Sequence, residues 1–483
     1  MEERKRMLRK IKNKNKDVRC VRPAAFLLAT IMILIYAAGC ASEGGTDVST
    51  PEPAATSAPA ATSAEPGTAG LHTGAPRDTE ADPEGNGDVV LSPERFGESF
   101  TLLCENSAPD LFVISQNVGA VAEKYGVTPV LKGADDMYSA VKSLVDSGMT
   151  EDVDLLLPTA ATAMRLTVGG YLQDLSEAGI GITPDTDGIN TALTSDVNIF
   201  GGVYMLFCDG LTSDVTASYG VLYRPGLVGV GFFYDPPSMI FSGEWSVPDF
   251  ITCANYAGTY ASLAGGSGLT MTSDSTHRLM LLGALGGKLY TAGEDGLPEF
   301  SSVAEGSNLA SAYSDTLSLL NSVNPPKPLK TPVMEITRIN SVKSGEVYLP
   351  LPFVDGTAIT PVDTAYCSVF AAPKGIAGGK RTAAIISALC DVVGSGARRE
   401  LMRSLYSDAV ENSKAMTDLI FRRQTAEPAM LLGWGDFDKL LSDGLDARTP
   451  LETLTGDRTF SDRKQALVTA AGIVAGRLGK SAE

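Results

Sequence analysis

The chain has 483 residues, with 39 Lys and Arg against 57 Asp and Glu, which gives a formal net charge of −18. Removing the ten basic and three acidic residues up to Arg22 leaves 29 basic and 54 acidic residues, a charge of −25. Such an acidic body argues against nucleic acid or an anionic lipid surface as its partner. Only two histidines occur, with no H-E-x-x-H or G-x-S-x-G motif, so we expect no metal, no cofactor and no Ser-His-Asp hydrolase.

The N-terminus reads as a targeting segment. Ten basic residues in the first 22 precede the apolar run 24–36, which is followed by Ala37, Ala38, Gly39 and Cys40. The run is short for a membrane span and has the form of a secretory signal. Small residues before Cys40 resemble a bacterial lipoprotein signal, in which that Cys becomes the acylated first residue. We therefore predict a signal peptide over residues 1–39, lipid attachment at Cys40, and a location on the outer face of the cytoplasmic membrane. An ordinary signal peptide with a chance Cys is the alternative.

Residues 40–97 are rich in Ser, Thr, Ala, Gly, Pro and acidic residues. Such a composition buries too little apolar surface to offset the entropy of ordering. We predict a flexible tether with a root-mean-square reach of roughly 40 Å for about 55 residues.

The remaining body, from residue 98, alternates predicted strands and helices. Strands are expected at 99–104 and 153–157, and helices at 135–146 and 160–166, the first helix ending at Gly148. Strands separated by helices predict an α/β fold with a mostly parallel sheet, and the length predicts two lobes. Five cysteines remain in this body, too few and too widely spaced for a dense disulfide framework. One pair could be bridged, and the sequence does not say which among Cys104, Cys208, Cys253, Cys367 and Cys390.

Several segments, in order, resemble the large extracellular family of solute-binding proteins of ABC importers that includes maltose and oligosaccharide binders. They are residues 124–127 (KYGV), 137–144, 153–156 (VDLL), 169–175 (GGYLQDL), 219–225 (YGVLYRP) with 231–235, 245–250 (WSVPDF), 346–352 and 370–375. No single segment is specific; their order across about 350 residues carries the match. Residues 333–340 depart from the family pattern, because they lack the aromatic that relatives place after this strand.

The resemblance implies a two-lobed, periplasmic-binding-protein-like fold of type II, with a ligand cleft between lobes joined by multiple chain crossings. The expected lobes are residues 98–222 with about 365–405, and residues 228–360 with about 410–475. The resemblance further implies a monomeric, non-enzymatic subunit that captures a small solute, expected from the family to be a carbohydrate, and passes it to ABC permease subunits.

Seven residues are candidates for ligand contact. Sugars need aromatic plates and short polar side chains, and ligands of open α/β sheets bind at the carboxyl ends of strands. Glu105, Asn106 and Thr159 are the candidates at predicted strand ends. Asp363 and Tyr366 lie near the return crossing, the segment in which the chain is expected to pass back from the second lobe to the first. The last two candidates are the tryptophans, Trp245 and Trp434. Trp434 stands between two glycines where relatives place a stacking aromatic, and Trp245 reads equally as a packing residue.

Other functions stay open at this point. The chain could bind a non-sugar solute or act as a sensor subunit, and a scaffold lipoprotein is a further alternative. A surface-anchored glycoside hydrolase is also compatible, because 54 acids supply many carboxylate pairs.

Overall fold

The computed structural model describes residues 98–479, apart from 178–179, 199, 229–231, 264, 272–274, 294–296, 324–329, 341, 408–409 and 457. The described residues belong to one compact unit of the chain, which begins at His72. The predicted signal peptide, Cys40 and tether lie outside the described residues.

The first sheet is parallel and has the strand order β2-β1-β3. Its strands are β1 (Ser99–Glu105), β2 (Thr128–Ala134) and β3 (Leu155–Leu157). β1 is central, with Leu102 opposite Leu131 on one side and Leu155 on the other. The predicted strands at 99–104 and 153–157 are therefore confirmed, and so is the α/β class.

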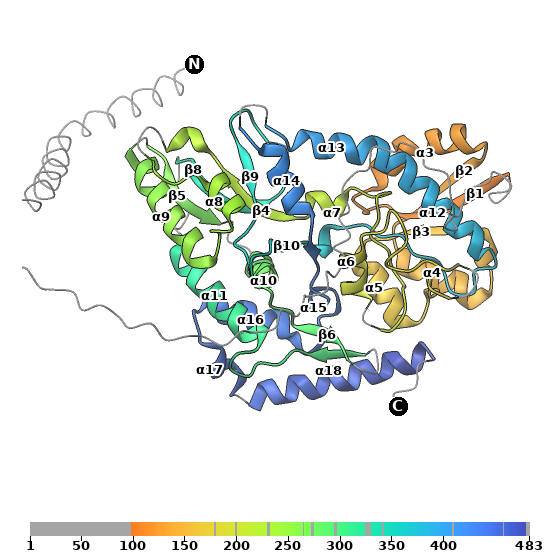
Figure 1. Ribbon diagram of the computed structural model, residues 1–483. Coiled ribbons are helices and arrows are strands. Elements are labelled where there is room, and N and C mark those ends of the chain that lie inside the picture. The colour runs from red at the N-terminus through yellow and green to blue at the C-terminus, as the bar shows by residue number, and fades with distance from the viewer. Residues whose placement is uncertain are drawn as a thin grey trace, which may run out of the picture. The chain divides into compact units, whose positions relative to one another are not determined.

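Helices α3 (Leu111–Tyr125), α4 (Met137–Ser147), α5 (Ala160–Gly169) and α12 (Gly379–Val393) cover this sheet (Figure 1). α4 begins at the N-cap Asp136 and ends at Gly148, whose φ of 70° lies in the left-handed region that glycine adopts without strain. In α5, the side chain of Thr159 accepts a hydrogen bond from the amide of Thr162. These caps explain why both helices could be predicted from the sequence.

The second sheet is mixed, with the order β5-β8-β4-β9. It contains β4 (Tyr219–Tyr223), β5 (Ser267–Met271), β8 (Pro332–Arg338) and β9 (Val347–Leu349). β4 runs antiparallel to β8 and β9, whereas β5 and β8 are parallel. The prediction of mostly parallel pairing therefore holds for the first sheet and fails for β4, which enters the second sheet in the opposite direction.

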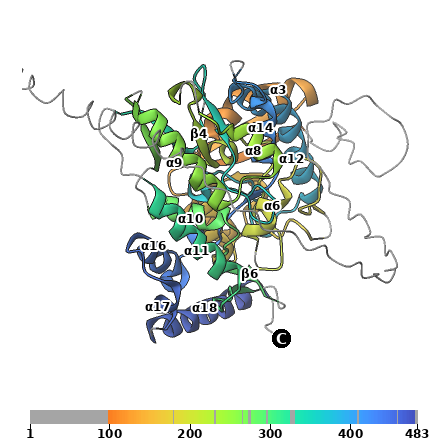
Figure 2. The same cartoon turned by 60° about the vertical axis from the view of Figure 1, so that its left-hand side comes forward.

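The chain passes between the two sheets more than once (Figures 1 and 2). It leaves the first sheet through α6 (Thr191–Val197) and α7 (Ser213–Thr216) to enter β4. It returns after β9, where Ala371 pairs with Leu156 of β3, and α12 then packs on α3. It leaves again through α13 (Arg399–Ser404) into α14 (Ser413–Phe421), which packs on β9.

The remaining elements complete the second half of the chain. They are α8 (Pro236–Ser242), α9 (Val247–Leu263), α10 (Ser275–Ala284), the pair β6 (Tyr290–Ala292) and β7 (Pro298–Phe300), α11 (Asn308–Ser322), the pair β10 (Thr360–Pro361) and β11 (Gln424–Thr425), α15 (Ala429–Leu432), α16 (Phe437–Asp446), α17 (Leu451–Thr455) and α18 (Arg458–Arg477). Among the helices of the described part of the chain, none is both long and apolar enough to cross a bilayer.

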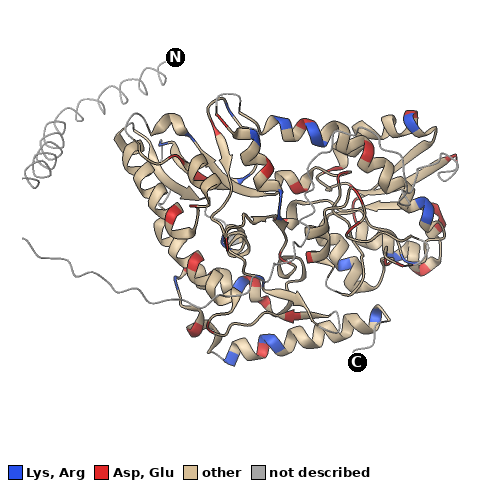
Figure 3. Ribbon diagram, in the orientation of Figure 1, with Lys and Arg blue, Asp and Glu red and all other residues tan. Residues whose placement is uncertain are grey.

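Two large apolar clusters form the interior. One lies between β1, α3 and α12 and contains Phe100, Leu102, Ile114 and Leu389. The other is continuous from Leu156 of the first sheet to Val333 of the second sheet. It also contains Trp245, whose ring packs edge-to-face on that of Phe250. Along the ribbon, positions of Lys and Arg are interspersed with those of Asp and Glu (Figure 3).

Candidate functional site

The carboxyl ends of the three parallel strands lie at one edge of the first sheet. β1 ends at Glu105, β2 at Ala134 and β3 at Leu157, so the residues that follow them are neighbours. The exposed amide of Asn106 donates to Asp135 across 2.6 Å, and the half-buried Thr159 follows β3. Glu105, Asn106 and Thr159 therefore stand at strand ends, and their contact with a ligand stays a prediction.

Glu105 has a structural role at this edge. One of its carboxylate oxygens accepts hydrogen bonds from the amide (2.7 Å) and the hydroxyl (3.1 Å) of Thr159, and the other accepts from the Thr162 hydroxyl at 3.1 Å. The carboxylate thus ties the end of β1 to the first turn of α5. Asn106 and Thr159 retain polar groups at the surface beside it.

The return crossing runs alongside the same edge. Thr159 forms an isolated antiparallel bridge with Ser368, and the amide of Ala160 donates to the carbonyl of Cys367 at 2.9 Å. A short 3-10 helix, η4 (Thr364–Tyr366), immediately precedes this contact. The backbone pairing therefore brings Tyr366, on the crossing, next to Thr159, at the end of β3.

Tyr366 forms an aromatic plate at this junction. Its side chain is 48 % exposed, and the guanidinium carbon of Arg338 lies 3.6 Å from its ring centre. Arg338 ends β8, and its Nε donates to the Tyr219 hydroxyl at 3.2 Å. One face of the ring is thus covered by a cation, while about half of the side chain stays open to solvent.

Buried groups on the return crossing and on β4 support Arg338. Asp363 is fully buried, and its amide donates to the carbonyl of Ala217 at 3.0 Å. Burial acts to lower the pKa of Arg338, but hydrogen bonds to Tyr366 and Tyr219 and the charge of Asp363 outweigh it and raise that pKa. Asp363 is therefore a buried residue that stabilises the charge of Arg338, and its predicted contact with the ligand stays a prediction.

Arg338 was missed by sequence reasoning. Residues 333–340 stood out only because they lack an aromatic, and that absence gave no indication that an arginine would take part. The neighbouring His277 packs edge-to-face on Tyr219, with ring centres 4.9 Å apart. His277 lies on α10 as a buried residue.

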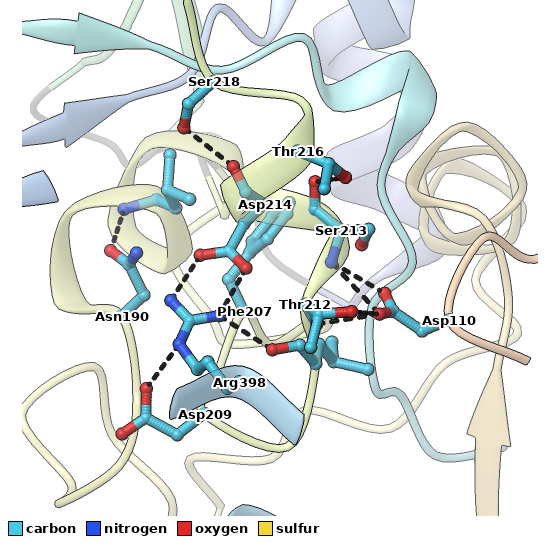
Figure 4. Close-up of polar contacts among 12 residues, drawn as sticks. Asp110, Asn190, Phe207, Asp209, Thr212, Ser213, Asp214, Thr216, Ser218 and Arg398 are labelled. Atoms are coloured by element: carbon cyan, nitrogen blue, oxygen red, sulfur yellow. Dashed lines mark hydrogen bonds and ion pairs between the residues drawn. The ribbon is translucent and has the colours of Figure 1, made fainter. Parts of the chain in front are cut away.

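A buried ionic network fixes the first crossing (Figure 4). Arg398 donates to both carboxylate oxygens of Asp214, at 2.6 and 2.8 Å, and to the Leu211 carbonyl at 2.7 Å. Its Nε lies 3.2 Å from Asp209. The bidentate pair joins the start of α13 to α7, so two segments that cross between the sheets are held together.

A second carboxylate anchors the same crossing. Asp110 is 1 % exposed and accepts from the amide and hydroxyl of Thr212, both at 2.7 Å, and from the amide of Ser213 at 3.1 Å. Burial raises the pKa of Asp110, and these hydrogen bonds counter part of that rise. Its own amide donates to Ser368, so both crossings meet at this residue.

The two tryptophans lie in packing environments. Trp245 has no exposed surface, and its indole N–H donates to the Pro350 carbonyl at 3.0 Å. Trp434 is half-buried, contacts Phe200 edge-to-face at 5.9 Å, and packs with a small cluster that contains Ala471. We therefore leave both out of the ligand surface proposed below.

The five cysteines of the body are buried and free. Burial raises the pKa of the Cys104 and Cys253 thiols to about 12, and it raises the pKa of Cys367 well above its usual range. Such thiols are poor nucleophiles. Within the described residues, no group of three or more potential ligands is placed to hold a metal ion.

No protein-family model matches this sequence, and no curated protein matches it. Among solved structures, a solute-binding protein of an ABC transporter from Agrobacterium radiobacter K84, in complex with ribitol, is similar at 14 % identity. The match covers 78 % of this chain and 99 % of that chain, with a TM-score of 0.43. The GacH receptor of Streptomyces glaucescens GLA.O, solved unliganded and with acarbose and an acarbose homolog, matches at 13 % identity over 79 % and 99 %, with a TM-score of 0.42.

An extracellular solute-binding protein of family 1 from Alicyclobacillus acidocaldarius matches at 13 % identity over 78 % of this chain and 98 % of its own, with a TM-score of 0.43. These similar structures belong to solute-binding proteins, the class that the sequence segments resemble.

Proposed function

We propose that this chain is a lipid-anchored, extracytoplasmic solute-binding subunit of an ABC importer, which captures a neutral carbohydrate or polyol without chemically changing it. The observation that carries the proposal is the half-exposed Tyr366 ring, stacked on Arg338 and next to the polar strand ends of the first sheet. An aromatic plate fits the apolar face of a sugar ring, and the hydroxyl of Thr159, which pairs with the same crossing, suits a hydroxylated rim.

The polar groups at the site favour binding over catalysis. The Glu105 carboxylate is occupied by Thr159 and Thr162, and Asp363 is enclosed beneath the surface. A glycosidase needs one carboxyl group able to donate a proton to the leaving oxygen and another placed on the opposite side of the bond. Neither residue offers a free carboxylate for that purpose.

We further propose that residues 98–222 with about 365–405, and residues 228–360 with about 410–475, act as two lobes whose relative position responds to ligand. The crossings at Ser213 and Ser368 would be the hinge. Their hydrogen bonds to one another and to Asp110 keep the hinge ordered. The lipid at Cys40 and the tether over residues 40–97 would hold this monomeric body near a membrane permease.

A thermal-shift screen tests the ligand class. The purified protein would be heated with panels of sugars, polyols, amino acids and oligopeptides, and we expect stabilisation by members of the sugar and polyol panels. Tyr366→Ala should remove most of that shift, whereas Tyr256→Ala should not. Tyr256 is a matched control, since it is 52 % exposed on α9. Stabilisation by amino acids or peptides alone would contradict the proposed ligand class.

A further inference from the structure

Two of the buried cysteines lie in segments that are far apart in sequence and adjacent in space. Cys208 lies in a segment held by backbone hydrogen bonds on both sides. Two residues before it, the amide of Leu206 donates to the carbonyl of Phe370. Directly after it, the amide of Asp209 donates to the carbonyl of Gly188 at 2.8 Å. Cys390 lies in the last turn of α12. Both belong to the apolar cluster beneath β1, with 2 % and 9 % of their surface exposed.

A Cβ placed on Gly188 would lie 3.4 Å from the Cβ and 3.8 Å from the sulfur of Cys390, and the next residue, Ile189, forms an isolated bridge with Cys208. The sulfur of Cys390 also lies 4.0 Å from the carbonyl oxygen of Gly188. The same oxygen accepts a hydrogen bond from the amide of Asp209, the residue that follows Cys208. A Cβ placed on Gly210 would lie 3.2 Å from the backbone nitrogen of Cys390. Glycine at that position therefore lets the turn after Cys208 approach the backbone of α12 closely.

The other three thiols are placed differently. Cys104 points toward the carbonyl of Leu102 at 3.8 Å, and Cys367 points toward that of Asp363 at 3.6 Å. Cys253 lies on α9, which packs on the second sheet. Proximity thus selects one pair among the five.

We propose that Cys208 and Cys390 form a disulfide in the exported protein. This inference depends on the proposed function in one respect only, because export places the protein in the oxidising environment outside the cytoplasm. The bond would join two residues of the apolar cluster beneath β1 that are 182 positions apart, and it would restrict the unfolded chain strongly.

The reaction is a thiol–disulfide exchange. One cysteine thiolate attacks a disulfide-carrying oxidant, such as an oxidised dithiol protein or oxidised glutathione, and releases one thiol of that oxidant. The second cysteine then displaces the other thiol, so the protein loses two hydrogens and the oxidant gains them. Burial raises the pKa of Cys208 well above its usual range, so the exchange belongs to a stage before this segment is fully packed.

Peptide mapping tests the proposal on the full chain exported from a bacterial host. The protein would be denatured in iodoacetamide without reductant, digested and analysed by mass spectrometry. We expect the peptides of Cys208 and Cys390 to be recovered cross-linked, 2 Da lighter than their sum, while Cys104, Cys253 and Cys367 are alkylated. Alkylation of both Cys208 and Cys390 before reduction would overturn the inference.

Refolding of the same chain with oxidised glutathione separates the two causes of failure. A cross-link that forms in that buffer but not in the exported protein would count against the proposed location. Absence of the cross-link from both the exported and the refolded protein would count against the pairing of Cys208 with Cys390. Cys104→Ala, in the same cluster, should leave the cross-link intact, whereas Cys390→Ala should leave Cys208 fully alkylated. The wild-type map remains decisive if a variant does not fold.

Discussion

Replacing Arg398 should destabilise the protein more than most surface charge changes. Its guanidinium binds Asp214 through two hydrogen bonds of 2.6 and 2.8 Å, and the Asp214 carboxylate is only 2 % exposed. Arg398→Ala leaves this carboxylate buried without its cation, which costs roughly 3–5 kcal/mol of unfolding free energy. Arg398→Lys keeps the charge but loses the bidentate geometry, so we expect a smaller loss, of about 1–3 kcal/mol.

Equilibrium urea unfolding, followed by far-UV circular dichroism, measures both losses. Arg399→Ala is the matched control, because Arg399 is the next residue along the chain and is exposed; it should change the free energy by less than about 0.5 kcal/mol. Replacing Arg398 by Met together with Asp214 by Leu should recover much of the loss, since neither position then leaves an unpaired buried charge. A loss below about 1 kcal/mol for Arg398→Ala would refute the assignment of this pair as a buried anchor.

Three further predictions follow from single residues. Cys40→Ala should abolish labelling by radioactive palmitate and release the protein or leave its signal uncleaved; retention of a signal-free variant on membranes would contradict the anchor. Trp434→Ala should lower the unfolding free energy by about 2–4 kcal/mol, as expected for a packed indole, while a weaker affinity with unchanged stability would instead restore its predicted ligand role. Burial raises the pKa of Glu427 from its ordinary 4.5 to about 7, although the amides of Leu289 and Ala429 counter this rise. The folded protein then binds a proton more tightly than the unfolded chain, so unfolding free energy should fall by up to about 3 kcal/mol between pH 4.5 and 7. Glu427→Gln should flatten that slope in urea titrations at pH 5 and pH 8, and an unchanged slope would show that another group is responsible.

Local features of the fold were predictable because local chemistry determines them. Thr159 and Gly148 cap helices through their own side chain and backbone, and β1 and β3 are short apolar runs between turns. The same logic placed Asn106 and Thr159 at strand ends, where parallel pairing brings them to one edge.

Features that depend on distant contacts were not predictable. Arg338 reaches Tyr219 across 119 positions, and Arg398 reaches Asp214 across 184. Nothing in the local sequence distinguishes these arginines from solvated ones. Trp245 shows the converse, because an aromatic at a helix start is compatible with ligand contact until burial by the second sheet is known.

The most direct measurement for the central claim is titration calorimetry with the best sugar or polyol from the screen, followed by mass analysis of the recovered ligand. Covering about 60 Å² of apolar ligand surface on Tyr366 is worth roughly 1.5 kcal/mol, or about tenfold in affinity. We predict one site per chain, a Tyr366→Ala variant that binds about tenfold more weakly with an unchanged melting temperature, and ligand returned intact. Cleaved ligand, or equal affinity in the wild type and the variant, would contradict the account.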